Sequence, residues 1–368
     1  MKVVIVGAGI VGCSAAYFLN EISGGDAEII LLDRCGVAAA ASGRAGGFLC
    51  PSWASSQLKT FARESYEIHC KFAEEFGAET IGFRPARAFS GAAPKSDRQN
   101  STSSRGTSKY WFNGCASPMR EIASFKDAAQ VVPERLVPCI AQASGATIII
   151  GRPVKLTSSK DGKYCIAVES TDGGSASTIS DVDRIIFACG PWTSKVTLSL
   201  GIRIEHCFGE LCHSILLKDA SNGNSFDASC LFLDWKGRQD ISDLELYSRV
   251  DGMYVSANCE GPVDASKLME PEEVMSTPQV RDALVDAAFS VSPNLAVQYS
   301  VSRSTACYLP ICATGLPLVG PVQAHAGIFV GCGLSCWGIM NGPITGKIVA
   351  QLALGKPTSV PFKSFLPK

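Results

Sequence analysis

The amino-terminal segment KVVIVGAGIVGCSAAYFLN contains three glycines, Gly7, Gly9 and Gly12, in the spacing G-x-G-x-x-G. Such glycines suit a phosphate site: the first permits a tight turn, the second lets the backbone approach a pyrophosphate, and the third lets a helix pack closely on a strand. A second apolar segment, EIILLD, ends at Asp33, whose carboxylate is suited to accept hydrogen bonds from ribose hydroxyls. Although a glycine-rich turn can serve packing alone, this combination predicts a dinucleotide-binding site.

A strand, a turn and a helix must position these residues. The β-branched run Lys2–Val6 predicts the strand, and small apolar residues after Gly9 predict the helix. The helix begins with Ile10 and Val11, so its free N–H groups and the positive end of its dipole face the phosphates. FAD and NAD are favoured over a dinucleotide with a 2′-phosphate only if the Arg34 side chain points away from the ribose. These residues therefore leave FAD and NAD both open.

The next segments favour FAD over NAD. Residues 36–53, GVAAAASGRAGGFLCPSW, form a small-residue loop that holds a single charge, Arg44. Such a loop suits a flat tricyclic ring, whereas an NAD domain continues with further strand and helix units. A buried strand in DRIIFACGPW (183–192) ends at Cys189 and Gly190, with Trp192 close behind. No second G-x-G-x-x-G follows it, which argues against an enzyme that binds both FAD and NAD.

A glycine-rich turn precedes the last helix, in GCGLSCWGIMNGPITGK (331–347). Glycine costs about 0.5–1 kcal/mol in a helix interior relative to alanine, so these glycines do not serve helix stability. Gly331, Gly333 and Gly338 predict a place where the backbone approaches a ligand. The helix is predicted to begin at about Gly338 and to run to Leu354.

The order of these segments resembles, over nearly the whole chain, the FAD-dependent oxidoreductases of the D-amino-acid-oxidase fold, which include glycine and sarcosine oxidases. Segment 313–321, ATGLPLVGP, belongs to this resemblance, and SCWGIMNGP (335–343) is similar to a eukaryotic branch of uncharacterised fungal and plant members. The resemblance implies FAD as cofactor, hydride transfer from a small amine or amino acid to flavin N5, and reoxidation by O2 to give H2O2. The turn at 331–338 would direct backbone N–H groups at the flavin pyrimidine ring.

The resemblance also implies that the backbone of Val154, in GATIIIGRPVKL (145–156), reads the adenine edge. Together with the motifs above, it predicts a set of cofactor-binding residues. They are Gly7, Gly9, Ile10, Val11, Gly12, Asp33, Arg34, Ala41, Ser42, Arg44, Ala45, Gly46, Gly47, Val154, Cys189, Gly190, Trp192, Cys307, Gly331, Gly333, Leu334, Ser335, Cys336, Trp337, Gly338 and Ile339.

The expected fold class is α/β, with a discontinuous Rossmann-type FAD-binding domain and an α+β substrate domain built on an antiparallel sheet. The FAD-binding domain is predicted at 1–84, 140–205 and 305–368, and the substrate domain at 85–139 and 206–304. Alternating segments at 213–217, 244–250 and 252–257 predict strands of the antiparallel sheet, and Asp251-Gly252 predicts a hairpin turn. Residues 91–109 are polar and predict a loop.

Three polar residues that are common in the family are replaced in this chain. Leu309 stands where amino-acid oxidases carry an arginine, Thr314 replaces an aspartate, and Leu334 replaces a histidine. An amino acid held by the familiar arginine is therefore not expected.

Substitute catalytic residues are sought on the predicted antiparallel sheet. Tyr247 and Arg249 lie two residues apart, so they face the same side of a strand and could hold a carboxylate, although an exposed strand face is as common. His213, in CHSILL, lies on a strand predicted to pass over the flavin, where a structural histidine is the alternative.

Cys307 aligns with the cysteine that carries covalent flavin in monomeric sarcosine oxidase, but a buried cysteine is usually a small hydrophobic residue. His69, His206 and His325 show no clustering with cysteines or carboxylates, so no metal site is predicted.

Composition excludes some classes of partner. The 368 residues include 33 basic and 34 acidic ones, so no basic excess is available for a nucleic acid. No apolar run approaches the roughly 18 residues of a membrane helix, and no secretory signal precedes the first strand. The 16 cysteines are scattered without zinc-type spacing. We therefore expect reduced thiols and an intracellular location, cytoplasmic or organellar.

The sequence thus predicts an FAD-dependent oxidoreductase that oxidises a small amine or amino acid with O2. Two alternatives stay open. The chain could be a flavin-binding protein with little turnover that acts as a regulatory or interaction module. It could also be a dehydrogenase that uses an acceptor other than oxygen.

Overall fold

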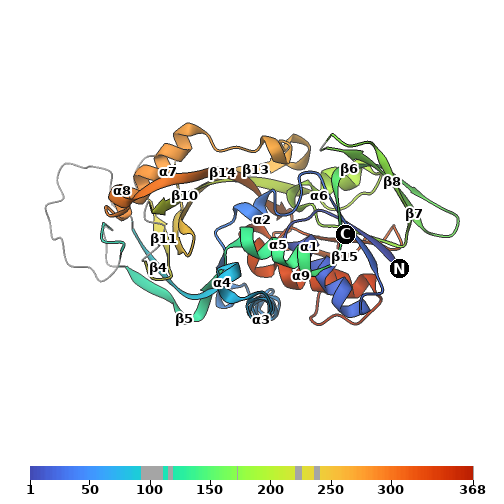
Figure 1. The fold of residues 1–368 in the computed structure, drawn as a ribbon, viewed down its shortest axis with the longest axis horizontal. Coiled ribbons are helices and arrows are strands. Elements are labelled where there is room, and N and C mark those ends of the chain that lie inside the picture. The colour runs from blue at the N-terminus through green and yellow to red at the C-terminus, as the bar shows by residue number, and fades with distance from the viewer. Residues whose placement is uncertain (93–110, 115–118, 172, 220–225, 236–240, 368) are drawn as a thin grey trace.

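The computed structural model describes residues 1–92, 111–114, 119–171, 173–219, 226–235 and 241–367 (Figure 1). Most of the predicted polar loop at 91–109 lies outside these residues. The described strands form two eight-stranded sheets, one at each end of an elongated molecule. Both termini lie at the end that holds helices α1 (Ile10–Ser23) and α9 (Gly338–Ala353).

The first sheet, called sheet A, has a parallel centre of apolar strands. Its strand order is β15 (Leu318–Pro321), β16 (Ile328–Cys332), β9 (Arg184–Phe187), β1 (Lys2–Val6), β2 (Glu28–Asp33), β6 (Thr147–Ser158), β7 (Tyr164–Ser170) and β8 (Ser177–Val182). β1 is buried on both faces, as its continuous run of β-branched residues predicts for a central parallel strand. The parallel strands end on one side, where the turns after β1, β2, β9 and β16 converge.

Helices α1 and α9 pack against each other on one face of sheet A. Two glycines of α9 allow this approach: a Cβ at Gly342 would lie 2.6 Å from Ile10, and one at Gly346 would lie 2.6 Å from the backbone of Ala15. Helices α3 (Lys59–Phe76) and α5 (Pro133–Ala143) add further apolar side chains to the same core. The close packing brings the amino termini of α1 and α9 to the same edge of the sheet.

The second sheet, called sheet B, is antiparallel except for one pair of strands. Its strand order is β14 (Tyr299–Cys312), β10 (Cys207–Asp219), β13 (Gly252–Asp264), β12 (Leu244–Arg249), β11 (Ser229–Asp234), β4 (Arg84–Ala92), β5 (Arg120–Gln130) and β3 (Phe48–Leu49). β4 and β11 form the parallel pair. The predicted hairpin is confirmed, because Arg249 pairs with Gly252 across the turn.

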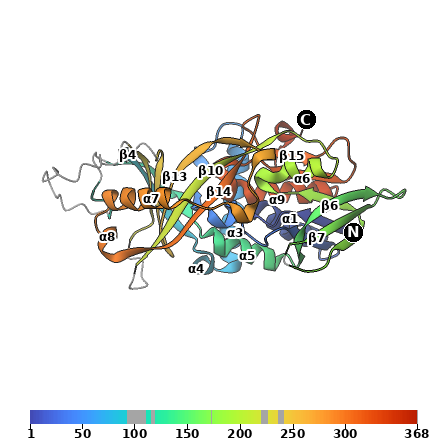
Figure 2. The same ribbon diagram turned by 90° about the horizontal axis from the view of Figure 1, so that it is seen from above.

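The two faces of sheet B have different neighbours. Helix α7 (Pro278–Val291) covers the outer face and packs on residues such as Leu217 and Leu246 (Figure 2). The inner face carries Leu216, Tyr247 and Tyr254. β14 belongs to sheet B over its whole length and crosses the boundary predicted at residue 305, so we propose that the substrate domain extends to residue 312.

Candidate functional site

A cavity of about 300 Å³ opens at the carboxyl ends of the parallel strands of sheet A. Its walls include the turns that follow β1, β2, β9 and β16, and residues of β14 lie opposite. In open α/β sheets, ligands bind in the crevice outside these strand ends. The fold therefore places a ligand site where the predicted glycine motifs meet.

Most of the predicted cofactor residues line this cavity. They are Gly7, Gly9, Ile10, Val11, Asp33, Arg34, Ala41, Ser42, Ala45, Cys189, Gly190, Trp192, Gly331, Gly333, Leu334, Ser335, Cys336, Gly338 and Ile339.

The other predicted cofactor residues do not line the cavity. They are Gly12, Arg44, Gly46, Gly47, Val154, Cys307 and Trp337. Gly12 supports the site from within the fold, because a Cβ there would lie 1.8 Å from the carbonyl oxygen of Gly7. Gly46 packs closely against the inner face of sheet B, because a Cβ there would lie 2.2 Å from the ring of Tyr247. A Cβ at Gly47 would lie 2.1 Å from the carbonyl oxygen of Val131.

Arg44 needs correction, and Val154 stays a prediction. Arg44 donates hydrogen bonds to the carbonyl oxygens of Ala306 (2.6 Å) on β14 and of Val274 (3.0 Å), so its guanidinium joins these segments and is absent from the cavity lining. The Val154 side chain is exposed, and its neighbours Gly151, Arg152 and Pro153 line the cavity, so the contact of its backbone with the adenine stays a prediction. The register of β6 and β7 shifts between Pro153 and Lys155.

Asp33 and Arg34 have partners that the sequence did not indicate. The Asp33 carboxylate accepts hydrogen bonds from the backbone N–H groups of Ala8 (2.7 Å), Cys35 (2.8 Å) and Gly36 (2.9 Å). A carboxylate accepts about four hydrogen bonds, so Asp33 retains capacity for about one ribose hydroxyl instead of two. Arg34 forms ion pairs with Glu272 and, at 3.4 Å, with Glu270. Its charge is therefore committed to these acids.

The segment that supplies these acids forms part of the cavity wall. Glu270 and Pro271 line the wall, and Lys195 lies 2.8 Å from the Glu270 carboxylate. The indole N–H of Trp192 donates to the carbonyl oxygen of Met269 at 3.0 Å. The sequence indicated only an irregular segment at 267–279. The residues Glu270-Pro271-Glu272-Glu273 form a short capped helix that the local sequence could have indicated. The contacts of this helix with Arg34 and Lys195 could not be predicted from neighbouring residues.

Two glycines leave open space in the cavity wall. A Cβ at Gly190 or at Gly338 would find no protein atom within 4 Å. Gly338 begins α9, and the residue before it, Trp337, provides no side-chain cap for the helix. No side chain of Trp337 therefore caps the first N–H groups of α9, which lie beside the cavity. Such N–H groups can donate hydrogen bonds to the carbonyl oxygens of a ligand ring.

The predicted catalytic pair Tyr247 and Arg249 lies on the inner face of sheet B. Tyr247 donates a hydrogen bond from its hydroxyl to the Glu245 carboxylate. Arg249 is 1% exposed and binds Asp251 at 2.6 Å and Glu134 at 3.2 Å. Arg249 is therefore part of a buried ion-pair network, and we correct its assignment as a carboxylate anchor.

His213 lies on the outer face of sheet B, contrary to its predicted place over the flavin. Its ring nitrogens lie 3.2 Å from the Ser276 hydroxyl and 3.4 Å from the Glu260 carboxylate. Residues two and four positions further along β10, Ile215 and Leu217, pack in the outer core with α7. Because side chains alternate along a strand, His213 faces the same way and away from the cavity.

The structure does not bring Cys307 to the cavity. Cys307 is buried on β14, and desolvation raises the pKa of its thiol to about 11. Since the thiolate is the nucleophile of cysteine, this thiol is poorly suited to attack a flavin. Leu309 and Leu334, two of the three replaced family positions, do line the cavity, whereas Thr314 is exposed.

Two glutamates near the cavity were not predicted. Glu245 is half-buried on the inner face of β12, and Glu210 lies on β10 directly opposite Leu309 of β14. Desolvation raises the pKa of the Glu245 carboxyl to about 7, opposed by the Tyr247 hydroxyl and reinforced by Asp243. The pKa of the Cys336 thiol is raised by desolvation, then by the charges of Glu245 and Glu210.

The raised pKa of Glu245 predicts a pH-dependent stability. Between its usual pKa of 4.5 and about 7, the folded protein retains a proton that the unfolded chain has lost. The free energy of unfolding should therefore fall as pH rises through this window, by an amount on the order of 3 kcal/mol. Denaturant unfolding of the wild type and Glu245→Gln at pH 4.5 to 8 measures this. A stability difference between them that does not change with pH would contradict the prediction.

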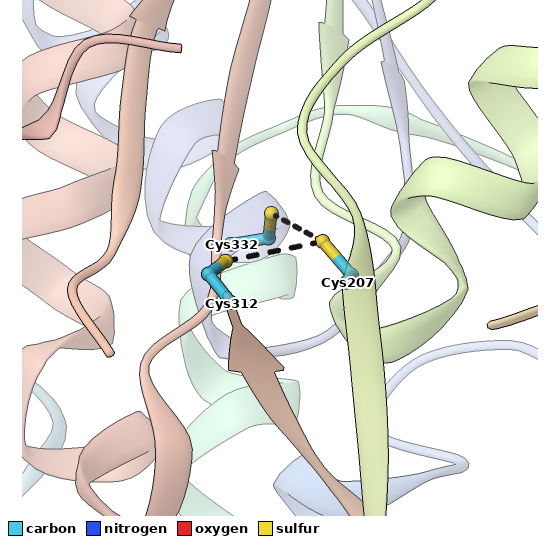
Figure 3. Close-up of side chains that lie close together, drawn as sticks. All are labelled: Cys207, Cys312 and Cys332. Carbon is cyan, nitrogen blue, oxygen red and sulfur yellow. Dashed lines mark hydrogen bonds between the residues drawn. The ribbon is translucent and has the colours of Figure 1, made fainter. Parts of the chain in front are cut away.

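Three buried cysteines meet where the two sheets come together (Figure 3). The Cys207 sulfur, on β10, lies 3.9 Å from the sulfur of Cys312 and 3.6 Å from that of Cys332. Cys312 and Cys332 are 105 and 125 residues from Cys207 along the chain, so local spacing does not predict the cluster. Three sulfurs can act as soft metal ligands, so the absence of a metal site stays a prediction.

Other features of the described residues bear on the remaining predictions. Most of their cysteines are free thiols, although Cys212 is disulfide-bonded, and the intracellular location stays a prediction. None of the helices in the described part of the chain combines the length and apolar character needed to cross a membrane. His69 is buried with its Nε2 2.9 Å from the carbonyl oxygen of Ile339, which links α3 to the first turn of α9.

Comparison with known proteins agrees with the geometry of the cavity. The family model for FAD-dependent oxidoreductases matches residues 2–352. The chain belongs to this family. FAD is therefore the cofactor of this oxidoreductase, and the cavity fits it: residues of the dinucleotide motif line its wall, and so do the open positions at Gly190 and Gly338.

Full-length relatives accompany the family match. An oxidoreductase of Schizosaccharomyces pombe is 28% identical over 374 residues, which cover 96% of this chain and 94% of the relative. The crystal structure of glycine oxidase from Geobacillus kaustophilus has a TM-score of 0.76 and 17% identity, covering 99% of this chain and 98% of that one. Iminodiacetate oxidase from a Chelativorans species has a TM-score of 0.74 and 21% identity, with the same coverage. These two likenesses confirm the α/β fold.

Proposed function

We propose that this oxidoreductase oxidises a small amine or amino acid and uses O2 as its electron acceptor. The observation that supports this is a group of half-buried aromatic rings beside the start of α9. The Trp53 ring lies 5.0 Å from that of Phe232 and 6.4 Å from that of Trp337. These rings, with Tyr247 and the neighbouring Cys336, define what we call the substrate chamber. A small substrate there would meet the ring end of the FAD.

Bound FAD supplies a hydride acceptor for the carbon next to the substrate nitrogen and a path for two electrons to oxygen. The chain's own residues bind and orient the partners. We propose that the first turn of α1 holds the pyrophosphate, that Asp33 holds a ribose hydroxyl, and that Gly338 and Ile339 present N–H groups to the pyrimidine ring. The aromatic rings exclude water and position the substrate.

Visible spectroscopy of the purified protein tests this proposal. We expect flavin bands that pass into the supernatant after acid precipitation, and bleaching of these bands by an amine or amino acid without air. Rapid return of the colour in air would support O2 as acceptor. Colour that stays in the pellet would revive Cys307 as a covalent attachment site. Flavin that no amine or amino acid bleaches would favour a binding protein without turnover, and slow recovery in air would favour a dehydrogenase.

A further inference from the structure

The substrate chamber carries two carboxylates. Glu245 lies two residues from Tyr247 on β12, so both face the inner side of sheet B. Glu210 lies on β10 in register with Leu309, so these two side chains also share one face. The charges of both carboxylates contribute to the raised pKa of the Cys336 thiol. One acid therefore stands beside the position where amino-acid oxidases carry an arginine.

The guanidinium groups near this face have other partners. Arg249 binds Asp251 and Glu134, Arg303 binds Glu134, and Arg44 binds two backbone carbonyls. Within the described part of the chain, Glu245 accepts its hydrogen bond from Tyr247, a neutral hydroxyl. No ion pair to Glu210 is found among the described residues. The chamber therefore combines negative charge with aromatic walls.

We propose that the substrate is an amine without a carboxylate, which enters the chamber as its cation between Glu245, Glu210 and the aromatic rings. This inference rests on the proposed function and narrows it. Aromatic faces attract ammonium groups, most strongly where water is excluded, and carboxylates add the opposite charge. An amino acid would bring its own carboxylate against Glu210 and the partly ionised Glu245, and the three arginines named above are bound to other partners. Leu309 leaves that part of the wall apolar.

Glu245 is also suited to prepare the amine for oxidation. An ammonium group must lose one proton before the carbon next to it can release a hydride. That proton passes to the Glu245 carboxylate, giving a neutral amine and a neutral carboxylic acid. The pKa of Glu245, raised by desolvation to about 7, is close to the value that makes a general base efficient near neutral pH. The other titratable groups around it, among the described residues, include Tyr247, Asp243, Cys230, Cys336 and Glu210.

The test uses matched probes on the FAD-loaded protein. Benzyltrimethylammonium, a cation without an oxidisable nitrogen lone pair, is compared with benzoate, an anion of similar size. Binding is followed by the change in flavin absorption and by tryptophan fluorescence. Benzylamine and both enantiomers of phenylglycine, which differ by the carboxylate, are then compared as reductants without air. We expect the cation to bind and benzylamine to bleach the flavin, with benzoate and phenylglycine inactive.

Three variants locate the effect. Glu245→Gln and Glu210→Gln should each weaken binding of the cation by about tenfold or more. Glu79→Gln, at an exposed position of α4 (Ala78–Ile81), should leave it unchanged. An unchanged FAD spectrum shows that a variant has folded. Preferential binding of benzoate, bleaching by phenylglycine, or wild-type binding in both chamber variants would overturn this inference while leaving the proposed oxidase function intact. If no amine or amino acid bleaches the flavin, the proposed function fails, and the binding comparison still decides the charge preference.

Discussion

Replacing Gly338 with leucine is expected to reduce the affinity for FAD by about 100-fold or more, which corresponds to roughly 3 kcal/mol. A Cβ at this position meets no protein atom within 4 Å, so the leucine side chain would extend into the cavity without disturbing the protein around it. The apoprotein should therefore fold normally. The measurement is the quenching of FAD fluorescence on titration with apoprotein, with circular dichroism as the check on folding.

A matched control separates the cavity from the effect of a larger side chain. A Cβ at Gly261, on β13, would also meet no atom within 4 Å, but this glycine is exposed and lies outside the cavity lining. Gly261→Leu should bind FAD like the wild type. Stoichiometric FAD in purified Gly338→Leu would show that the start of α9 does not contact the cofactor.

Replacing Arg249 with methionine is expected to lower the free energy of unfolding by about 3–5 kcal/mol. The guanidinium is 1% exposed and binds both Asp251 and Glu134, and it also donates to the carbonyl oxygen of Ala45. Methionine would leave the Asp251 carboxylate buried without its cation, and this uncompensated charge is the main cost. Denaturant unfolding of the FAD-loaded protein measures the loss.

The contrast with an exposed arginine sharpens this prediction. Arg281 pairs with its neighbour Asp282 at the surface, so Arg281→Met should change stability by less than about 0.5 kcal/mol. Adding Asp251→Asn to Arg249→Met should recover part of the loss, because it removes the unpaired carboxylate. Equal stability of Arg249→Met and the wild type would mean that the network contributes nothing. Retained substrate oxidation by the folded variant would agree with a structural role for Arg249.

Local sequence was enough to predict many of the residues that line the cavity. The turn at Gly7 and Gly9, the strand that ends at Asp33 and the turn before Gly338 each depend on neighbours along the chain. A strand, a glycine turn and a helix form a unit that can be recognised without its tertiary partners. The same holds for the hairpin at Asp251-Gly252.

Long-range pairing explains what the sequence did not reveal. Whether His213 faces the cavity or the outer core depends on which side of sheet B is covered by α7. The residues around His213 do not indicate that side. The commitment of Arg249 to Glu134, and of Arg34 to Glu272, joins residues 115 and 238 positions apart. The register shift in β6 beside Val154 is likewise set by its pairing with β7. The proposed role of Glu245 and Glu210 could not be predicted, because it depends on the fold bringing β12, β10 and the turn before α9 together.

The pairing of β10 with β14 has a consequence for how the enzyme selects its substrate. Hydrogen-bonded partners run from Cys207 and Cys312, beside sheet A, to Asp219 and Tyr299 at the far end of sheet B. This ladder, which shifts register between Leu216 and Leu217, joins the part of β14 that lines the FAD cavity to the far end of sheet B, so we expect this wall of the cavity and the sheet to move as one body. We expect a chamber of fixed size that admits molecules by side-chain rotation. Selectivity in such an enzyme changes through replacement of individual wall residues and is insensitive to interdomain motion.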